Sequence, residues 1–132
     1  APTVSTSIIR FDPDPDLQPS RVMPRRSFTT GDTTDLDHSF FAAENGSVQT
    51  GVWEGAPARF EIEGYPSHEL MSILSGSVTI TDLDTGHAET FTTGDTFFVT
   101  KGSRIVWEIT ETMRKYYVIV HDAPPTAPGA SS

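Results

Sequence analysis

The sequence predicts an all-β protein, a sandwich or barrel built from roughly eight or nine short strands at 8–12-residue spacing. Short runs rich in valine, isoleucine, threonine and aromatic residues recur from about residue 38 onward. Turns containing glycine or proline separate these runs, for example at 93–95 and 101–103. No window shows the 3.6-residue periodicity of an amphipathic helix, which argues against a helical fold.

Each expected strand has a β-type pattern. The run at 58–65 alternates most clearly, because Phe60 and Ile62 share one face and the charged residues share the other. The run at 113–120 is the most continuous and is predicted to be buried. Gly76 and Gly94 fall at breaks, where glycine tolerates positive φ. The predicted strands are 48–55, 58–65, 69–76, 77–84, 89–93, 96–100, 104–110 and 113–120.

The length and composition predict one domain with irregular ends. The chain has 132 residues, enough for one hydrophobic core. Its apolar fraction of 36% is below that of average globular domains, and part of the deficit lies at the two ends. We therefore expect a partly ordered N-terminal arm at 1–37, a barrel at 38–122 and a disordered tail at 123–132.

The charge excludes several classes of partner. The formal net charge of −9 argues against a nucleic-acid-binding protein and against docking on anionic membranes. The chain contains no cysteine, which excludes disulfides, zinc–thiolate sites and cysteine nucleophiles. No apolar run approaches the roughly 20 residues that a membrane-spanning helix needs, and no signal peptide is recognisable. We therefore expect a cytoplasmic protein without nucleic-acid or membrane partners.

Short motifs in a fixed order carry a family resemblance. Glu69 is followed after six residues by Gly76, and Gly94 after five residues by the triplet at 100–102. With the Trp-Glu pairs at 53–54 and 107–108 and the Lys-x-Tyr at 115–117, this pattern resembles the cupin superfamily. It is most similar to a small cupin group named for the (S)-ureidoglycine aminohydrolase cupin domain. The resemblance covers roughly residues 48–120 and implies a double-stranded β-helix, or jelly-roll barrel, that is often dimeric.

The resemblance also implies a metal position, and this sequence departs from it. Metal-binding cupins use two histidines and a glutamate from the first motif and one histidine from the second. Here the first two histidine positions hold Glu63 and Tyr65, or the residues before each, and the third holds Ile105. Only the glutamate, Glu69, remains. We predict no cofactor and no standard metal site, with a nonstandard divalent metal site as the alternative.

Glu69 is the central candidate, because the motif directs this position into the barrel. In a regular strand the neighbouring His68 then points outward. If the alternation continues unbroken, Glu63 and Tyr65 also point inward, along with Arg59 and Glu61. In the competing interpretation, the face that carries these residues is the solvent face. The remaining histidines are expected at the surface: His38, His87 and His121.

Lys115 and the aromatic residues each have two interpretations. Lys115 either faces the interior, where it could pair with Glu69, or lies on a charged edge. The aromatic side chains either line a mostly apolar ligand pocket or only fill the core. The candidate pocket residues are Trp53, Glu63, Tyr65, Glu69, Trp107, Lys115 and Tyr117, with Glu69 as the candidate catalytic group.

Three functions fit these residues. The leading prediction is a homodimeric cupin that binds a small polar metabolite without a histidine-ligated metal. The first alternative is an enzyme, a hydrolase or isomerase, acting on a ureido, amino or sugar compound with Glu69 as the acid–base group. The second is a structural or regulatory dimer. Because a fold does not fix chemistry, the residues leave open whether the protein is an enzyme.

Overall fold

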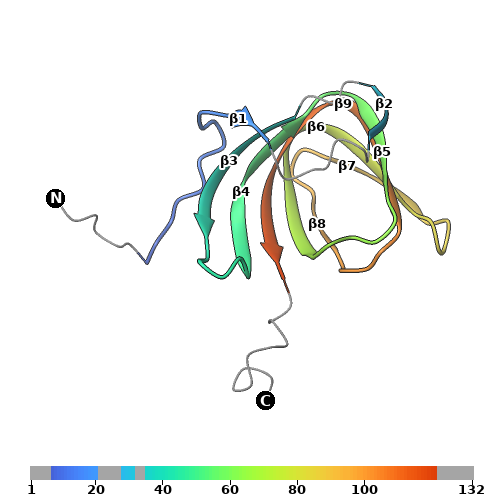
Figure 1. Ribbon diagram of the computed structural model, residues 1–132. Helices are drawn as coiled ribbons and strands as arrows, with labels where there is room; N and C mark the ends of the chain where they lie inside the picture. The colour runs from blue at the N-terminus through green and yellow to red at the C-terminus, as the bar shows by residue number, and fades with distance from the viewer. Residues whose placement is uncertain (1–6, 21–27, 32–34, 122–132) are drawn as a thin grey trace, which may run out of the picture.

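The computed structural model describes residues 7–20, 28–31 and 35–121, and the regular structure within these ranges is all β-strand. The predicted all-β class is therefore confirmed (Figure 1). The strands are β1 (Gln18–Pro19), β2 (Phe28–Gly31), β3 (Asp35–Ala42), β4 (Val48–Gly55), β5 (Ala58–Ile62), β6 (His68–Asp82), β7 (Ala88–Thr92), β8 (Thr96–Val99) and β9 (Ile105–Val120).

Two long strands, β6 and β9, each take part in both of two facing sheets. The C-terminal half of β9 pairs with β4, and its N-terminal half pairs with β5. β6 runs antiparallel to β9 along its length, and its other edge pairs first with β8 and then with β7. One sheet therefore runs β1-β3-β4-β9-β6-β8 and the other β2-β5-β9-β6-β7. The sheets curve around a shared interior, as in a double-stranded β-helix (Figure 1).

The bend that carries β6 from one sheet into the other lies around Gly76. The register between β6 and β9 shifts between Ile73 and Val78, which marks bulges in the ladder. Gly76 has a φ of 82°, and a Cβ atom there would lie 2.1 Å from the carbonyl oxygen of Thr112. Only glycine combines that backbone conformation with that close approach.

Two predicted strand breaks are wrong. The predicted strands 69–76 and 77–84 form one continuous strand, and so do the predicted strands 104–110 and 113–120. The physical reason in β6 is that a bulge bends a strand sharply without ending its pairing.

Strand β3 was missed by the sequence analysis, because its pattern is not the usual one. Asp35 and Asp37 stand at alternate positions and pair with the inward-facing β4 positions Gly55 and Trp53. Polar residues on the core-facing side hide the hydrophobic alternation that normally reveals a strand. The structure thus extends the sheet into the segment that was expected to be the arm, while 123–132 lies outside the described residues.

The core between the sheets is aromatic. Trp107 and Phe60 are fully buried and stack with ring centroids 5.5 Å apart. Trp53 meets Trp107 edge-on at 6.3 Å. Phe60 and Ile62 face this core, as their alternation predicted, so the charged face of β5 points away from it.

Residues near the N-terminus lie on the outer face of the sheet that contains β3, β4 and β9. The ring of Phe11 packs against Phe40 at 4.7 Å and against Tyr116 at 5.3 Å. The Tyr116 hydroxyl donates a hydrogen bond to the carbonyl oxygen of Phe11 at 3.0 Å. This stretch therefore covers apolar surface on the outside of the barrel.

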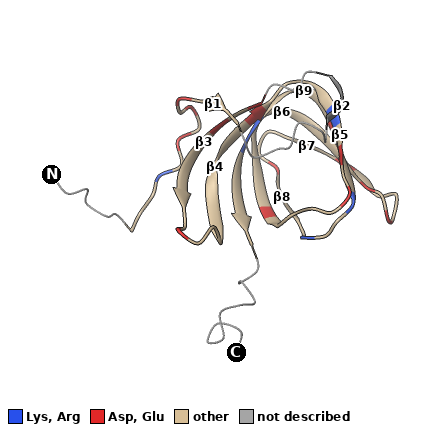
Figure 2. Cartoon of the chain, viewed as in Figure 1, with Lys and Arg blue, Asp and Glu red and all other residues tan. Residues whose placement is uncertain are grey.

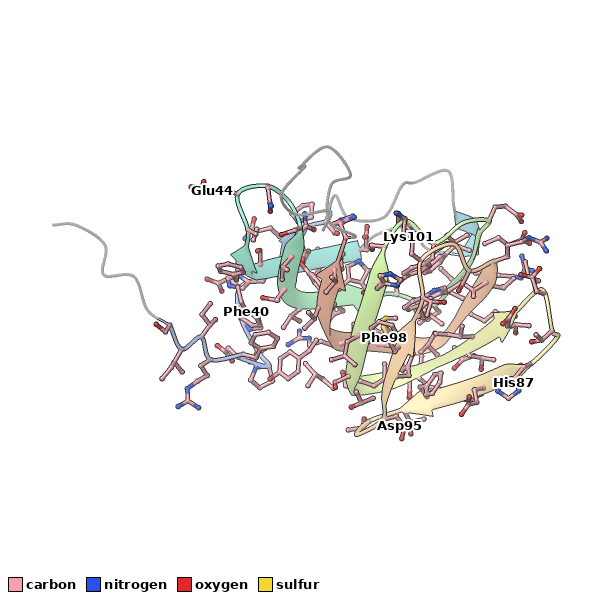
Figure 3. The ribbon with its side chains drawn as sticks, turned by 90° about the horizontal axis from the view of Figure 1, so that it is seen from below. Phe40, Glu44, His87, Asp95, Phe98 and Lys101 are labelled. Atoms are coloured by element: carbon pink, nitrogen blue, oxygen red, sulfur yellow. The ribbon has the colours of Figure 1, made fainter. Side chains whose placement is uncertain are left out.

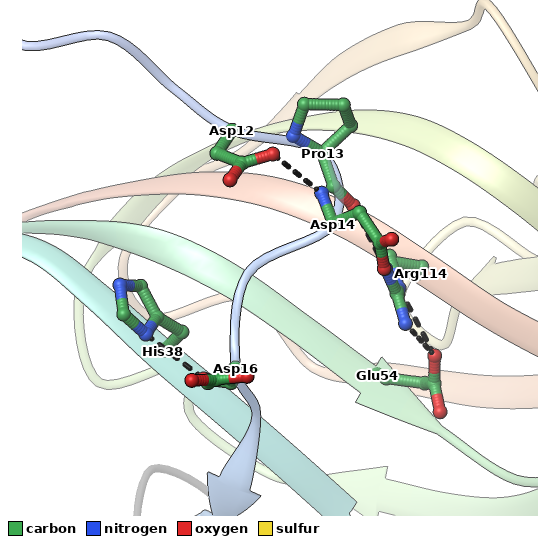
Figure 4. A network of polar contacts seen from close by, with 7 residues as sticks. All are labelled: Asp12, Pro13, Asp14, Asp16, His38, Glu54 and Arg114. Atoms are coloured by element: carbon green, nitrogen blue, oxygen red, sulfur yellow. Dashed lines mark hydrogen bonds and ion pairs between the residues drawn. The ribbon is translucent and has the colours of Figure 1, made fainter.

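Polar contacts hold the same segment in place (Figure 4). Arg114 pairs with Glu54 at 2.9 Å and with Asp14 at 3.0 Å, which joins the segment to β4 and β9. His38 Nδ1 lies 2.9 Å from the carbonyl oxygen of Asp16. These contacts cross the outer face rather than the barrel interior.

Acidic residues are spread along the loops and strand ends, with fewer basic residues among them (Figure 2). Within the described residues, the structure contains no helix whose length and apolarity would let it cross a bilayer.

We expect Gly76→Ala to lower the free energy of unfolding by about 1–3 kcal/mol through backbone strain, with a further loss from contact with Thr112. Gly86→Ala is the matched control, since Gly86 has a φ of 77° but no atom within 4 Å of the place that an alanine Cβ would occupy. Urea denaturation of both variants measures the difference. Equal losses would show that the close approach at Gly76 carries no cost.

Candidate ligand site

A buried polar cluster, which we call the central cluster, lies inside the barrel and consists of Tyr65, Glu69 and Lys115. The Tyr65 hydroxyl donates to Glu69 Oε1 at 2.5 Å, and Lys115 Nζ donates to Glu69 Oε2 at 2.9 Å. The side chains of Glu69 and Lys115 are only 7% and 6% exposed. Both carboxylate oxygens of Glu69 are therefore engaged within the chain.

The strands and one connection position these three groups. Glu69 lies near the start of β6, and Lys115 lies on the half of β9 that pairs with it. Tyr65 belongs to the connection between β5 and β6, which backbone hydrogen bonds join to the turn after β8. Its N–H donates to the carbonyl oxygen of Ser103 at 2.9 Å, and its carbonyl oxygen accepts from Gly102 at 2.8 Å.

The ammonium group of Lys115 is enclosed by soft, polarisable groups. Its Nζ atom lies 4.5 Å from the ring centroid of Trp107, 5.1 Å from that of Trp53 and 3.0 Å from Met71 Sδ. Aromatic faces attract a cation through their quadrupole, more strongly when water is excluded. The lysine thus has an anion on one side and aromatic surface on the other.

Tyr65 is held as a neutral hydrogen-bond donor. Burial raises the pKa of its phenol well above 10.0, and the charge of Glu69 and the hydrogen bond to Glu69 raise that pKa further. Loss of the phenolic proton would place two negative charges together in a dry interior.

A second polar group, formed by Asp35 and Asp37, was missed by the sequence analysis. The Trp53 indole donates to Asp35 Oδ2 at 2.9 Å, and the Tyr117 hydroxyl donates to Asp37 Oδ1 at 2.7 Å. Burial raises the pKa of Asp37 above its ordinary 3.8, while the hydrogen bond from Tyr117 acts in the opposite direction. Burial and then the hydrogen bond to Asp37 also raise the pKa of Tyr117.

Two glycines in β4 could have revealed this group. A Cβ on Gly51 would lie 2.7 Å from the Tyr117 hydroxyl oxygen, and a Cβ on Gly55 would lie 2.3 Å from the ring of Trp53. Glycines two residues on either side of Trp53 therefore mark the face of the strand where large aromatic groups need room.

The structure brings together most of the predicted pocket residues. Around or beside the central cluster lie Trp53, Tyr65, Glu69, Trp107 and Lys115, while Tyr117 connects to Asp37. Of the two interpretations of Lys115, the inward one is observed.

Glu63 is the exception, because its predicted inward position is wrong. Its side chain is 69% exposed and accepts a hydrogen bond from Arg104 at 3.1 Å. Ile62 faces the core, so Glu63 points outward like Arg59 and Glu61, and the irregular connection after β5 resets this alternation and turns Tyr65 inward. Arg59 and Glu61 pair with each other at 2.9 Å, each about one-third exposed, on the outward face of β5.

The histidines lie away from the central cluster. His68 is on the opposite face of β6 from Glu69, where its ring stacks on Phe98 and its Nδ1 accepts from the Lys101 N–H at 3.0 Å. His87 pairs with Glu89 in an exposed position, and the His121 N–H donates to Ser47 at the end of β9.

The residues at the implied metal position do not fit a metal ion. Glu69 is the sole family ligand, and its two oxygens already accept hydrogen bonds from Tyr65 and Lys115. Among the described residues, no three histidine, aspartate or glutamate side chains are grouped so that they could hold a metal. Transition metals in such barrels need several imidazole and carboxylate donors, which the described part of the interior does not offer.

A separate cavity, which we call the seam cavity, opens between β7 and β8. Both strands pair with β6, and within the described residues no backbone pairing joins one to the other. Phe91 of β7 and Phe97 of β8 stack across this seam with centroids 3.9 Å apart. The cavity measures about 390 Å³. Its lining consists of Ile80, Asp82, His87, Glu89, Phe91, Thr96, Phe97, Phe98, Val99, Thr100, Ser103 and Ile105.

Strand pairing connects some residues that line the seam cavity with residues in or beside the central cluster. Val99 lines the cavity and stands opposite Glu69 in the pairing of β8 with β6. Ile80 lines the cavity and stands opposite Trp107 in the pairing of β6 with β9. The indole N–H of Trp107 is buried and has no hydrogen-bond partner in the described structure. Figure 3 shows Phe98 on β8 and His87 at the loop before β7, which help to locate the seam.

The facing sheets, the bulged bend at Gly76 and the inward carboxylate of Glu69 define a cupin-fold barrel. Residues 42–117 match the family described as the EutQ-like cupin domain, and the chain belongs to that family. The predicted cupin superfamily is thereby confirmed. The finer relation to the (S)-ureidoglycine aminohydrolase group stays a prediction.

Solved structures share this fold. A protein of unknown function from the DUF861 family of Pseudomonas syringae pv. tomato is 27% identical over 83% of the chain, with a TM-score of 0.72. The chain spans only 46% of that protein. The EutQ protein of Clostridium difficile is 20% identical, with 67% of this chain and 68% of that one covered and a TM-score of 0.57.

A third solved structure, a putative ethanolamine utilization protein Q of Salmonella typhimurium, is 19% identical with a TM-score of 0.59. The match covers 83% of this chain and 100% of that one. At these identities, the two EutQ structures show the fold alone. Comparison with curated proteins gave no match.

We expect Lys115→Met to lower the free energy of unfolding by about 3–5 kcal/mol, because Glu69 would remain as a buried charge without a counter-charge. The double variant Lys115→Met/Glu69→Gln should recover much of this loss, since no buried charge remains. Urea denaturation measures both. The control Glu61→Gln weakens the partly exposed pair with Arg59 and should cost less than about 1 kcal/mol. A Lys115→Met loss no larger than the control's would contradict the interpretation.

Asp37→Asn should change the pH dependence of stability. Because the folded-state pKa of Asp37 lies above its ordinary 3.8, the wild type loses stability as pH rises through that folded-state pKa. Asparagine cannot ionise, yet its side-chain oxygen can still accept from Tyr117. The stability of the variant relative to the wild type should therefore increase as the pH rises from 3.8 towards neutrality. Urea denaturation across this range tests it, and a constant difference would refute it.

Proposed function

We propose that this protein binds a small polar molecule in the seam cavity. The observation that carries the proposal is the cavity itself, a space of about 390 Å³ between β7 and β8. This size lies within the usual range of small-molecule sites, roughly 300–1,000 Å³. Its aromatic and aliphatic floor, formed by side chains such as Phe91, Phe97 and Ile105, suits the apolar part of a ligand.

The polar rim favours ligands that donate hydrogen bonds. Asp82 and Glu89 supply carboxylates, and Thr96, Thr100 and Ser103 supply hydroxyl groups, whereas no lysine or arginine is among the lining residues. Such a rim attracts amino, ureido and hydroxyl groups and repels carboxylates. Amino, ureido and sugar compounds are therefore the classes to test first.

The arginine next to these lining residues in the sequence reinforces this preference. Arg104 lies between two lining residues, Ser103 and Ile105, but its guanidinium pairs with Asp84 at 2.8 Å and with Glu63 at 3.1 Å. Its positive charge is thus directed to carboxylates outside the lining. An anionic ligand would find little compensation here.

Binding is favoured over the enzymatic alternative because of how Glu69 is held. An acid–base group needs a carboxylate oxygen that can reach a substrate, and both oxygens of Glu69 already accept hydrogen bonds. The homodimer and the cytoplasmic location stay predictions. For a second copy, the surface to examine is the outer groove of about 160 Å³ lined by Phe11, Leu70, Ser72, Tyr116, Tyr117 and Val118.

The test is a titration followed by ¹⁵N–¹H NMR, with benzylammonium, benzyl alcohol and benzoate as probes that differ mainly in charge. We expect shift changes confined to the seam cavity, with benzylammonium binding most tightly and benzoate most weakly. Glu89→Gln should weaken benzylammonium binding several-fold while leaving benzyl alcohol unchanged, because only the charged probe loses a partner.

The matched control is Glu111→Gln, which removes an exposed carboxylate on β9 that does not line the cavity. It should leave all three affinities unchanged. Shift changes spread over the barrel surface, or an equal effect of the two variants, would overturn the proposal. A subsequent thermal-shift panel of amino, ureido and sugar compounds would then identify the natural ligand class.

A further inference from the structure

We propose that Lys115 is a built-in cation that fills, beside Glu69, the place that the cupin resemblance assigns to a metal ion. The role of Lys115 does not depend on a ligand in the seam cavity. Because the interior residues do not fit a metal ion, the charge of Glu69 needs another partner.

The first step is the need for a positive charge. Glu69 is 7% exposed at its side chain, and a buried carboxylate without a counter-charge is costly. Lys115 Nζ lies 2.9 Å from Glu69 Oε2, and Tyr65 donates to the other oxygen. The acid therefore has a charge partner and a neutral donor, and neither comes from outside the chain.

The second step is the chemistry around the ammonium group. Two indole rings, at 4.5 and 5.1 Å, and the Met71 sulfur at 3.0 Å surround Lys115 Nζ. Aromatic faces stabilise an ammonium ion by cation–π attraction. Divalent manganese, iron, nickel and zinc instead require several nitrogen or oxygen donors. The surroundings therefore select an ammonium ion over a metal ion.

The third step is geometry. Lys115 stands opposite Trp53 on β4 and opposite Ile73 on β6, so its backbone is fixed by ladders on both edges. Glu69 lies before Ile73 on β6. The carboxylate and the ammonium group therefore meet between the strands only because both side chains are long. A shorter cation at position 115 would not reach the acid.

The experiment is a chemical rescue of Lys115→Ala. This variant lacks the atoms from Cγ to Nζ, and n-propylammonium has the same three carbons and one nitrogen. Added propylammonium should raise the melting temperature of Lys115→Ala, while propanol and Mn²⁺ or Zn²⁺ should not. The wild type and Lys115→Ala/Glu69→Gln should not respond to propylammonium, because the first has its own ammonium and the second has no acid.

The rescue has a clear negative outcome. No selective stabilisation of Lys115→Ala by propylammonium, or a larger one by the divalent ions, overturns the proposal. The same holds if the wild type binds Mn²⁺ or Zn²⁺ more strongly than Glu69→Gln does.

A second measurement uses only proteins that retain Lys115. NMR of the lysine side-chain ammonium groups in the wild type should show one NH₃⁺ signal with slow hydrogen exchange, from Lys115, and Glu69→Gln should shift it. The exposed Lys101 is the matched control and should exchange fast. A neutral amine at Lys115, or exchange as fast as at Lys101, would reject the built-in cation.

Discussion

The ion pair between Glu69 and Lys115 is the constraint around which the barrel interior is arranged. A carboxylate and an ammonium group less than one-tenth exposed are tolerable only if each has close partners. The partners come from four separate parts of the chain: Tyr65 from a connection, Met71 from β6, Trp53 from β4 and Trp107 from β9. The pair therefore links the two sheets through their most buried side chains.

The same arrangement explains why a glycine stands two residues away from Trp53 on either side in β4. Trp53 contributes a ring face to the lysine and its indole N–H to Asp35, so it joins two polar groups at once. It can do so because Gly51 and Gly55 leave space on the same face. Trp53 thus fills the core and also supplies partners to buried polar groups. Buried polar groups in a small domain need such partners.

The sequence predicted the direction of side chains that follows from regular spacing along a strand. It did not predict the direction of side chains that depends on an irregular connection. Strand alternation placed Phe60 and Ile62 in the core, and the motif placed Glu69 inside. It could not decide which way Lys115 faces, since a charged residue in a buried strand is acceptable only with a partner that the sequence does not reveal. Glu63 was misplaced because the connection after β5 breaks the parity between Glu63 and Tyr65, and β3 was missed because aspartates occupy its inner face.

The seam between β7 and β8 has a consequence for kinetics. Within the described residues no backbone ladder joins β7 to β8, and a pair of phenyl rings meets across the gap instead. Ring contacts can separate and reform through side-chain rotation within nanoseconds to microseconds, without the cooperative loss of a strand. A ligand bound in the seam cavity, as we propose, would enter and leave through brief opening of this ring contact while the strands stay paired. Its exchange would be fast compared with global unfolding.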